Sequence, residues 1–164
     1  MPVVDWTRTD LDFELPTGAT CLRFDQDRFA AFELFILQRP DAEADYDDAT
    51  RIRAKQVYDA MSEADIDYLI MVIASALPGS TTDPLTIEGF REKLVAYRGI
   101  DAKVLRRHLV EFLETVTPIA ERLGVKLTLH PDDPPRPIFG LPRIVKNRDD
   151  LMRLVKMVDS PANG

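Results

Sequence analysis

Hydrophobic and polar residues alternate near the start of the chain and then recur at helical spacing up to about residue 100. Between residues 11 and 23, alternating apolar positions flank the turn-forming sequence Pro16-Thr17-Gly18, which predicts a β-hairpin. From Gln26 onward, apolar residues recur every three to four positions, which predicts a series of helices. Their predicted bounds are 26–37, 49–61, 63–76 and 86–97, with Ser62 as the N-cap of the third.

An acidic run over residues 41–48 separates the first two of these helices. It holds five acidic side chains and no basic one, a composition compatible with a metal site or with a solvated loop that leads into a helix N-terminus. We interpret the run as a loop and assign no chemistry to it.

A different pattern begins at residue 101. Asp101 is a predicted N-cap, and the apolar stripe that follows it predicts one long helix that ends at Leu123-Gly124. Directly after this glycine, Val125 to Leu129 are apolar and partly β-branched, which predicts a buried parallel strand. Helix and strand together indicate an α/β unit.

The last predicted helix spans residues 148–158, and Asn147 is its predicted N-cap. In an α/β pattern a strand should follow such a helix, so we expect one to begin after Asp159. The pattern therefore predicts an incomplete α/β unit at this end of the sequence.

The 164 residues include 21 basic and 28 acidic side chains, which give a net charge of −7. This acidic balance argues against binding to nucleic acid or to an anionic membrane, because both ligands require clustered Lys and Arg. Cys21 is the single cysteine, so no internal disulfide forms and a reducing, cytoplasmic setting is expected. The longest apolar run, residues 68–77, is about half the roughly 20 residues of a membrane-spanning helix.

His130 is the most informative polar residue, because it follows the predicted strand at the end where α/β folds build their active sites. A neutral imidazole is a good ligand for manganese, iron or zinc. The alternative is a histidine that caps the strand above a structural turn. Asp132 and Asp133 are candidates for orienting the ring, accepting a proton or binding substrate hydroxyls, and equally for forming the turn.

Three arginines are candidates for contact with a substrate. Arg136 and Arg143 lie in the proline-rich loop after the strand, where a guanidinium is suited to clamp a carboxylate or a phosphate. For Arg143 the alternative is an ion pair with the aspartates at 149–150. Arg8 lies close to Asp5 in the sequence, and it is either half of an ion pair or part of a pocket rim.

Several segments share an unusual pattern with a known family. They read LHPDDPPRPIFGLPRIV at 129–145, VDSPANG at 158–164 and MPVVDWTRTDL at 1–11. These segments closely resemble D-mannonate dehydratases. The sequence RFDQDRFAAFELFILQRPDAEADY at 23–46 is similar to an insertion in that family, so the resemblance covers essentially the whole chain.

The resemblance implies an α/β fold, namely an incomplete (β/α)8 TIM barrel segment of the xylose-isomerase-like group, with a helical insertion and a short hairpin. Residues 1–25 would form a strand end and the hairpin, 26–100 the insertion and 101–164 a barrel αβα segment, within one partial domain. It also implies a lyase that removes water from D-mannonate to give 2-dehydro-3-deoxy-D-gluconate in glucuronate catabolism. D-mannonate is then the expected small-molecule partner.

The resemblance further implies a Mn²⁺ or Fe²⁺ ion held by two histidines, one cysteine and one aspartate. His130 matches the first histidine, whereas Cys21 does not match the cysteine and His108 does not match the second histidine. In the family the other ligands follow the segment that matches residues 160–164. We therefore expect this chain to lack them and to be inactive alone.

Two further hypotheses stay open. One is a non-catalytic helical module that associates with copies of itself through exposed strand edges and uncovered helix faces, as a homo-oligomer. The other is a different divalent-metal sugar enzyme on a similar barrel, such as an isomerase or an epimerase.

Overall fold

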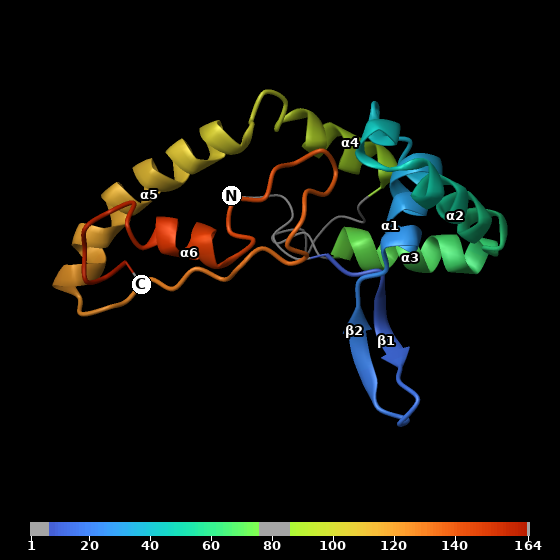
Figure 1. The fold of residues 1–164 in the computed structure, drawn as a ribbon, viewed down its shortest axis with the longest axis horizontal. Helices are drawn as coiled ribbons and strands as arrows, with labels where there is room; N and C mark the ends of the chain where they lie inside the picture. The colour runs from blue at the N-terminus through green and yellow to red at the C-terminus, as the bar shows by residue number, and fades with distance from the viewer. Residues whose placement is uncertain (1–6, 76–85, 164) are drawn as a thin grey trace. The chain divides into compact units, whose positions relative to one another are not determined.

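The computed structural model describes residues 7–75 and 86–163, and the chain divides into two compact units. The first unit comprises residues 1–98 and the second residues 99–164 (Figure 1). This boundary lies close to residue 101, where the sequence pattern changes. The interpretation of the whole chain as one partial domain stays a prediction.

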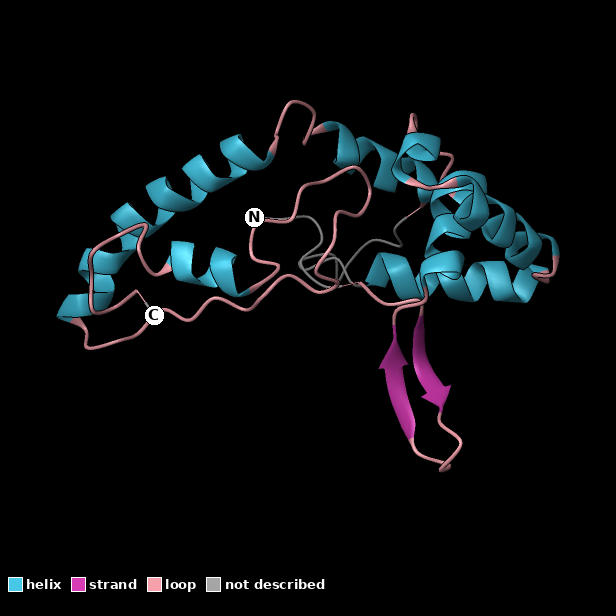
Figure 2. Ribbon diagram, in the orientation of Figure 1, coloured by secondary structure: helices cyan, strands magenta, loops and turns pink. Residues whose placement is uncertain are grey.

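The predicted hairpin is confirmed in the first unit. Strand β1, Asp10–Glu14, pairs antiparallel with β2, Thr20–Arg23, and Phe13 lies opposite Cys21. Gly18 adopts a φ of 81° in the connecting turn, which only glycine adopts without strain. The hairpin is the sole strand pair among the described residues. Figure 2 shows it projecting from the helical part of its unit, and near its base the N–H of Leu11 donates to the hydroxyl of Tyr68 at 3.1 Å.

The predicted helices of the first unit are also confirmed, with bounds that shift by one to a few residues. Each begins where a side chain accepts a hydrogen bond from a free backbone N–H, and Ser62 does so for the N–H of Asp65 at 3.2 Å. The acidic run holds a short 3-10 helix, Ala42–Asp45, in place of a plain loop. The α-helices are α1, Gln26–Ala31; α2, Asp48–Asp59; α3, Glu63–Ser75; and α4, Ile87–Val95.

A turn of π-helix, Phe32–Ile36, continues α1 and carries the core of the first unit. The Phe32 ring meets the Phe90 ring of α4 edge-on, with centroids 6.2 Å apart. Both side chains are almost fully buried, together with Leu69 and Ile73 of α3. Burial of such side chains contributes roughly 1.5–3 kcal/mol each, so these contacts hold the helices of the unit together.

The second unit is built on the long helix α5, Ala102–Arg122, and the short helix α6, Arg148–Leu154. Asp101 and Asn147 cap them as predicted, with oxygen–nitrogen distances of 2.8 and 3.0 Å. The prediction that α6 runs to residue 158 is wrong. After Leu154 the backbone tightens into turns with hydrogen bonds between residues three apart, and these satisfy the last carbonyls of the helix. None of the helices in the described ranges could cross a membrane.

The predicted strand Val125–Leu129 is not formed as a strand. Leu127 makes one isolated parallel bridge to Asn163, and its N–H donates to the carbonyl of Ala162 at 2.7 Å. The N–H of Val125 is already used, because it donates to the carbonyl of Ala120 and closes the C-terminus of α5 at 2.9 Å. The strand expected after Asp159 is reduced to the same single bridge.

Replacing Gly124 with Ala is expected to destabilise the second unit by about 1–2 kcal/mol, because Gly124 has a left-handed φ of 65°. Nothing lies within 4 Å of the position that a Cβ would take, so the effect comes from the backbone alone. Urea unfolding followed by circular dichroism measures it. Gly124→Asn is the matched control, since Asn tolerates this conformation, and an equal loss in both variants would contradict the explanation.

Candidate functional site

The candidate site lies on the segment from His130 to Val145, here called the 130–145 loop. The loop folds back on itself, and the N–H of Asp132 donates to the carbonyl of Val145 at 2.9 Å. Ile144 and Val145 are buried against Leu154 of α6, with partly buried side chains of α5 packed around them. The end of the loop is therefore anchored in the core of the second unit.

His130 lies at the start of this loop and is exposed to solvent. Its ring Nδ1 is 2.6 Å from the carbonyl oxygen of Pro131. A carbonyl oxygen only accepts hydrogen bonds, so in a neutral ring this contact places the proton on Nδ1 and the lone pair on Nε2. A metal-binding histidine has this arrangement. The geometry is thus compatible with the predicted ligand role, which stays a prediction.

Asp132 and Arg143 lie together. The Asp132 carboxylate accepts the N–H of Val145 at 2.6 Å, and its other oxygen is 3.5 Å from Nη1 of Arg143. The loop brings Asp132 to Arg143, whereas the alternative pairing of Arg143 with Asp149 or Asp150 stays a prediction. Both predicted substrate contacts are therefore engaged with each other inside the loop.

The other two predicted arginines lie apart from this pair. Arg136 is partly exposed in the 130–145 loop, where its N–H donates to the carbonyl of Pro134 at 2.8 Å. Arg8 belongs to the first unit, and its Nη1 donates to the carbonyl of Thr7 at 2.9 Å. Asp5, the predicted alternative partner of Arg8, lies outside the described residues. Substrate contact by either arginine stays a prediction.

The donor set does not make a metal centre by itself. In residues 7–75 and 86–163 no three His, Cys, Asp or Glu side chains come together to hold an ion. A catalytic ion typically needs about three protein ligands. Near the loop the described residues offer His130 and Asp132, and the Asp132 carboxylate already contacts Val145 and Arg143. Cys21 lies on β2 and His108 on α5, apart from the loop in the sequence and in neither case part of such a group. These residues alone therefore do not fit a manganese or iron ion.

Asp150 anchors the end of the loop, a role that was not predicted from the sequence. Its side chain is buried and accepts hydrogen bonds from the N–H of Lys146 at 3.2 Å and from Arg153 at 3.1 Å. Arg106 of α5 approaches the same carboxylate at 3.9 Å. The signal was the acidic residue three positions after the Asn147 cap, which is the spacing of a capping box.

A buried polar cluster in the first unit was also missed. Glu33 is 1% exposed, and its carboxylate accepts hydrogen bonds from Arg39 at 2.6 Å and from the Tyr46 hydroxyl. Arg39 also pairs with Asp45. Burial raises the pKa of Glu33 above its usual range, although the Arg39 charge and the Tyr46 hydrogen bond oppose the rise. An acid inside the apolar run FELFIL was the available signal.

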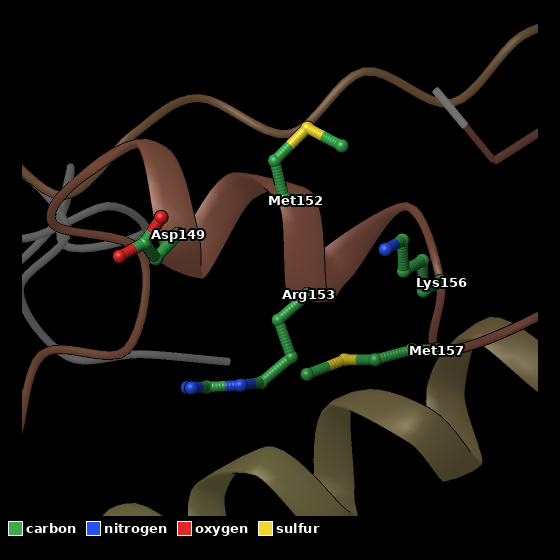
Figure 3. Close-up of a pocket in the computed structure, with 5 residues that line it drawn as sticks. All are labelled: Asp149, Met152, Arg153, Lys156 and Met157. Atoms are coloured by element: carbon green, nitrogen blue, oxygen red, sulfur yellow. The ribbon is translucent and has the colours of Figure 1, made fainter.

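An open pocket of about 420 Å³ lies on α6 and the turn after it. Figure 3 shows Met152 leaving the helix on the opposite side from Arg153, so the lining side chains do not converge on one point. None of the predicted site residues lines this pocket. The lining residues are Asp149, Met152, Arg153, Lys156 and Met157.

A family model described as D-mannonate dehydratase (UxuA) matches residues 1–164. The chain belongs to the D-mannonate dehydratase family. Its match to the family model therefore includes the hairpin, the helices of the first unit and the whole 130–145 loop.

Similar proteins are mannonate dehydratases of bacteria. The mannonate dehydratase of Brucella suis biovar 1 is 63% identical over 164 residues, which are 100% of this chain and 41% of that protein. That of Marinomonas sp. is 54% identical and is covered to 42%. The crystal structure of mannonate dehydratase from Streptococcus suis serotype 2 matches with a TM-score of 0.58 and 29% identity, over 100% of this chain and 33% of that one. The chain thus spans less than half the length of the relatives it matches.

Proposed function

We propose that this chain supplies part of the barrel and active site of a mannonate dehydratase, a lyase that removes water from D-mannonate to give 2-dehydro-3-deoxy-D-gluconate. The observation that carries the proposal is the 63% identity to the Brucella suis enzyme along the entire chain. The placement of His130 directly after the bridge-forming segment supports it. A place in glucuronate catabolism and a cytoplasmic location are parts of the same proposal.

The second unit supports the proposal that this part of the chain is a segment of a (β/α)8 barrel. Leu127 and Asn163 form a parallel bridge, and α6 lies between them in the sequence. Two parallel strands joined through a helix are the repeating element of a (β/α)8 barrel, and active sites of such barrels lie at the C-terminal ends of the strands. His130 follows Leu127 by three residues and is thus at the expected end.

In the proposed enzyme His130 is one ligand of a Mn²⁺ or Fe²⁺ ion, and Arg136 contacts the carboxylate of D-mannonate. Since the relatives are more than twice as long, we propose that the remaining ligands come from the parts that this chain does not match. Dehydration also requires a base that removes a proton next to the carboxylate and an acid that protonates the leaving hydroxyl. We assign neither role to a described residue.

A grafted enzyme tests this proposal. In it, the 164 residues of this chain replace the matching stretch of the Brucella suis mannonate dehydratase. We expect the grafted enzyme to form 2-dehydro-3-deoxy-D-gluconate from D-mannonate with Mn²⁺ present, at a rate within about tenfold of the unmodified enzyme. A folded grafted enzyme that binds D-mannonate but forms no product would contradict the proposal.

Self-association is the second candidate function, and the apolar surface of α5 favours it. Phe112 and Ile119 are 58% and 47% exposed, and Leu123 after the helix is 71% exposed. Exposed apolar side chains that share one helix face favour association. We expect the chain alone to elute in size-exclusion chromatography as a species larger than the monomer, and Phe112→Lys with Ile119→Lys to shift it toward the monomer. A concentration-independent monomer before substitution would contradict this.

A further inference from the structure

We propose that Asp132 is a positioning residue, which ties the two ends of the 130–145 loop together and thereby holds the His130 ring at the start of the loop. This inference deepens the proposed function, on which its significance rests. It differs from the prediction that Asp132 binds substrate hydroxyls.

Asp132 contacts residues at the other end of its own loop. Its backbone N–H donates to the carbonyl of Val145 at 2.9 Å, and the N–H of Val145 donates back to its carboxylate at 2.6 Å. Arg143 faces the second carboxylate oxygen at 3.5 Å. The Asp132 side chain is 18% exposed and that of Arg143 5%, so the carboxylate is directed at the end of its own loop.

These contacts of Asp132 with Val145 and Arg143, here called the tie, determine where the His130 ring lies. The ring is exposed, and its Nδ1 contacts the carbonyl of Pro131, which is the next residue in the chain. A ring held through its own backbone takes its position from that backbone. Asp132 fixes this backbone two residues later by joining it to Val145, which is buried among the apolar side chains of the second unit.

The loop that the tie closes has little conformational entropy to lose. Residues 133–144 lie between its two ends, and four of them are prolines, at 134, 135, 137 and 142. Proline restricts the unfolded chain, so closing this loop costs less conformational entropy than closing a flexible one of the same length. A few hydrogen bonds at Asp132 are therefore sufficient to hold the loop closed.

Asp132→Ala in the 164-residue chain tests the tie, because it removes both carboxylate oxygens and leaves the Val145 N–H without its side-chain acceptor. We expect the Val145 amide proton to exchange with solvent at least about tenfold faster. In NMR spectra the His130 ring signals should move toward those of free imidazole, while the ring of His108 on α5 stays unchanged as an internal reference. Asp149→Ala, which removes the same side chain from an exposed position, should change neither signal.

Unchanged Val145 exchange together with an unchanged His130 ring in Asp132→Ala would overturn the inference. If Asp132→Ala does not fold, Asp132→Ser takes its place, because its side chain stays polar but is one bond too short to reach the Val145 N–H as the carboxylate does. The inference then predicts faster Val145 exchange and a shifted His130 ring at an unchanged His108 signal. Unchanged signals would again contradict it.

The grafted enzyme separates positioning from substrate contact. A positioning role predicts that Asp132→Ala lowers kcat by about 10- to 100-fold with KM within about twofold. A rise in KM at unchanged kcat would overturn it in favour of substrate contact. The NMR experiment needs no activity, so a grafted enzyme that is inactive before substitution counts against the proposed function, while the exchange data still decide the role of Asp132.

Discussion

Replacing Arg39 with Met is expected to destabilise the first unit by about 3–5 kcal/mol at pH 7, because it leaves the buried Glu33 carboxylate without its positive partner. This is a large part of the 5–15 kcal/mol that holds a typical domain folded. Urea unfolding measured by circular dichroism at pH 7 and pH 5 is the test.

The loss should be smaller at pH 5 than at pH 7. Arg39 is the strongest influence that lowers the Glu33 pKa, so its removal raises this pKa further above the usual 4.5. A carboxyl with a raised pKa in the folded state binds protons more tightly there than in the unfolded chain. The folded state of the variant therefore gains stability as pH falls toward the unfolded pKa and loses it as pH rises.

The double variant Glu33→Gln with Arg39→Met is the matched control, since it removes both charges of the pair. It should be less destabilised at pH 7 than Arg39→Met alone and should lose most of the pH dependence between pH 5 and 7. Equal losses in the single and the double variant at both pH values would contradict a charge-pair origin.

His130→Ala in the grafted enzyme is expected to lower dehydratase activity at least about 100-fold and to weaken Mn²⁺ binding. Losing a group that only supports a metal ligand typically costs 10- to 100-fold, so losing a ligand itself should cost at least as much. Product formation and the free Mn²⁺ signal in electron paramagnetic resonance give two independent measurements.

His108→Ala is the control for this variant, because the chain has two histidines and His108 lies exposed on α5. It should leave activity and Mn²⁺ binding within about twofold of the unmodified grafted enzyme. A His130→Ala enzyme with full activity and full Mn²⁺ binding would show that His130 is not a metal ligand.

Local signals predicted most of the fold. The turn at Gly18 and the caps at Ser62, Asp101 and Asn147 act within a few residues of their own position, and each is formed as expected. The strand over residues 125–129 failed for the opposite reason. A strand needs a neighbouring strand to hydrogen-bond with. Among the described residues this segment has a single bridge, from Leu127 to Asn163.

The candidate site was predictable in its position but not in its contacts. His130 stands out because it ends an apolar segment and precedes a proline-rich loop. That Asp132 reaches Val145 and Arg143 depends on how the 130–145 loop folds back, which residue spacing does not reveal. The Glu33 cluster was missed for the same reason, since Arg39 and Tyr46 approach it only after the chain turns past the π-helix.

A crystal structure of the Mn²⁺-loaded grafted enzyme tests the central claim most directly, because it shows which residues hold the metal. The account predicts that Nε2 of His130 is bonded to the ion, with Nδ1 still donating to the carbonyl of Pro131. A bound ion held entirely by other residues, with the His130 ring outside its coordination sphere, would contradict the account.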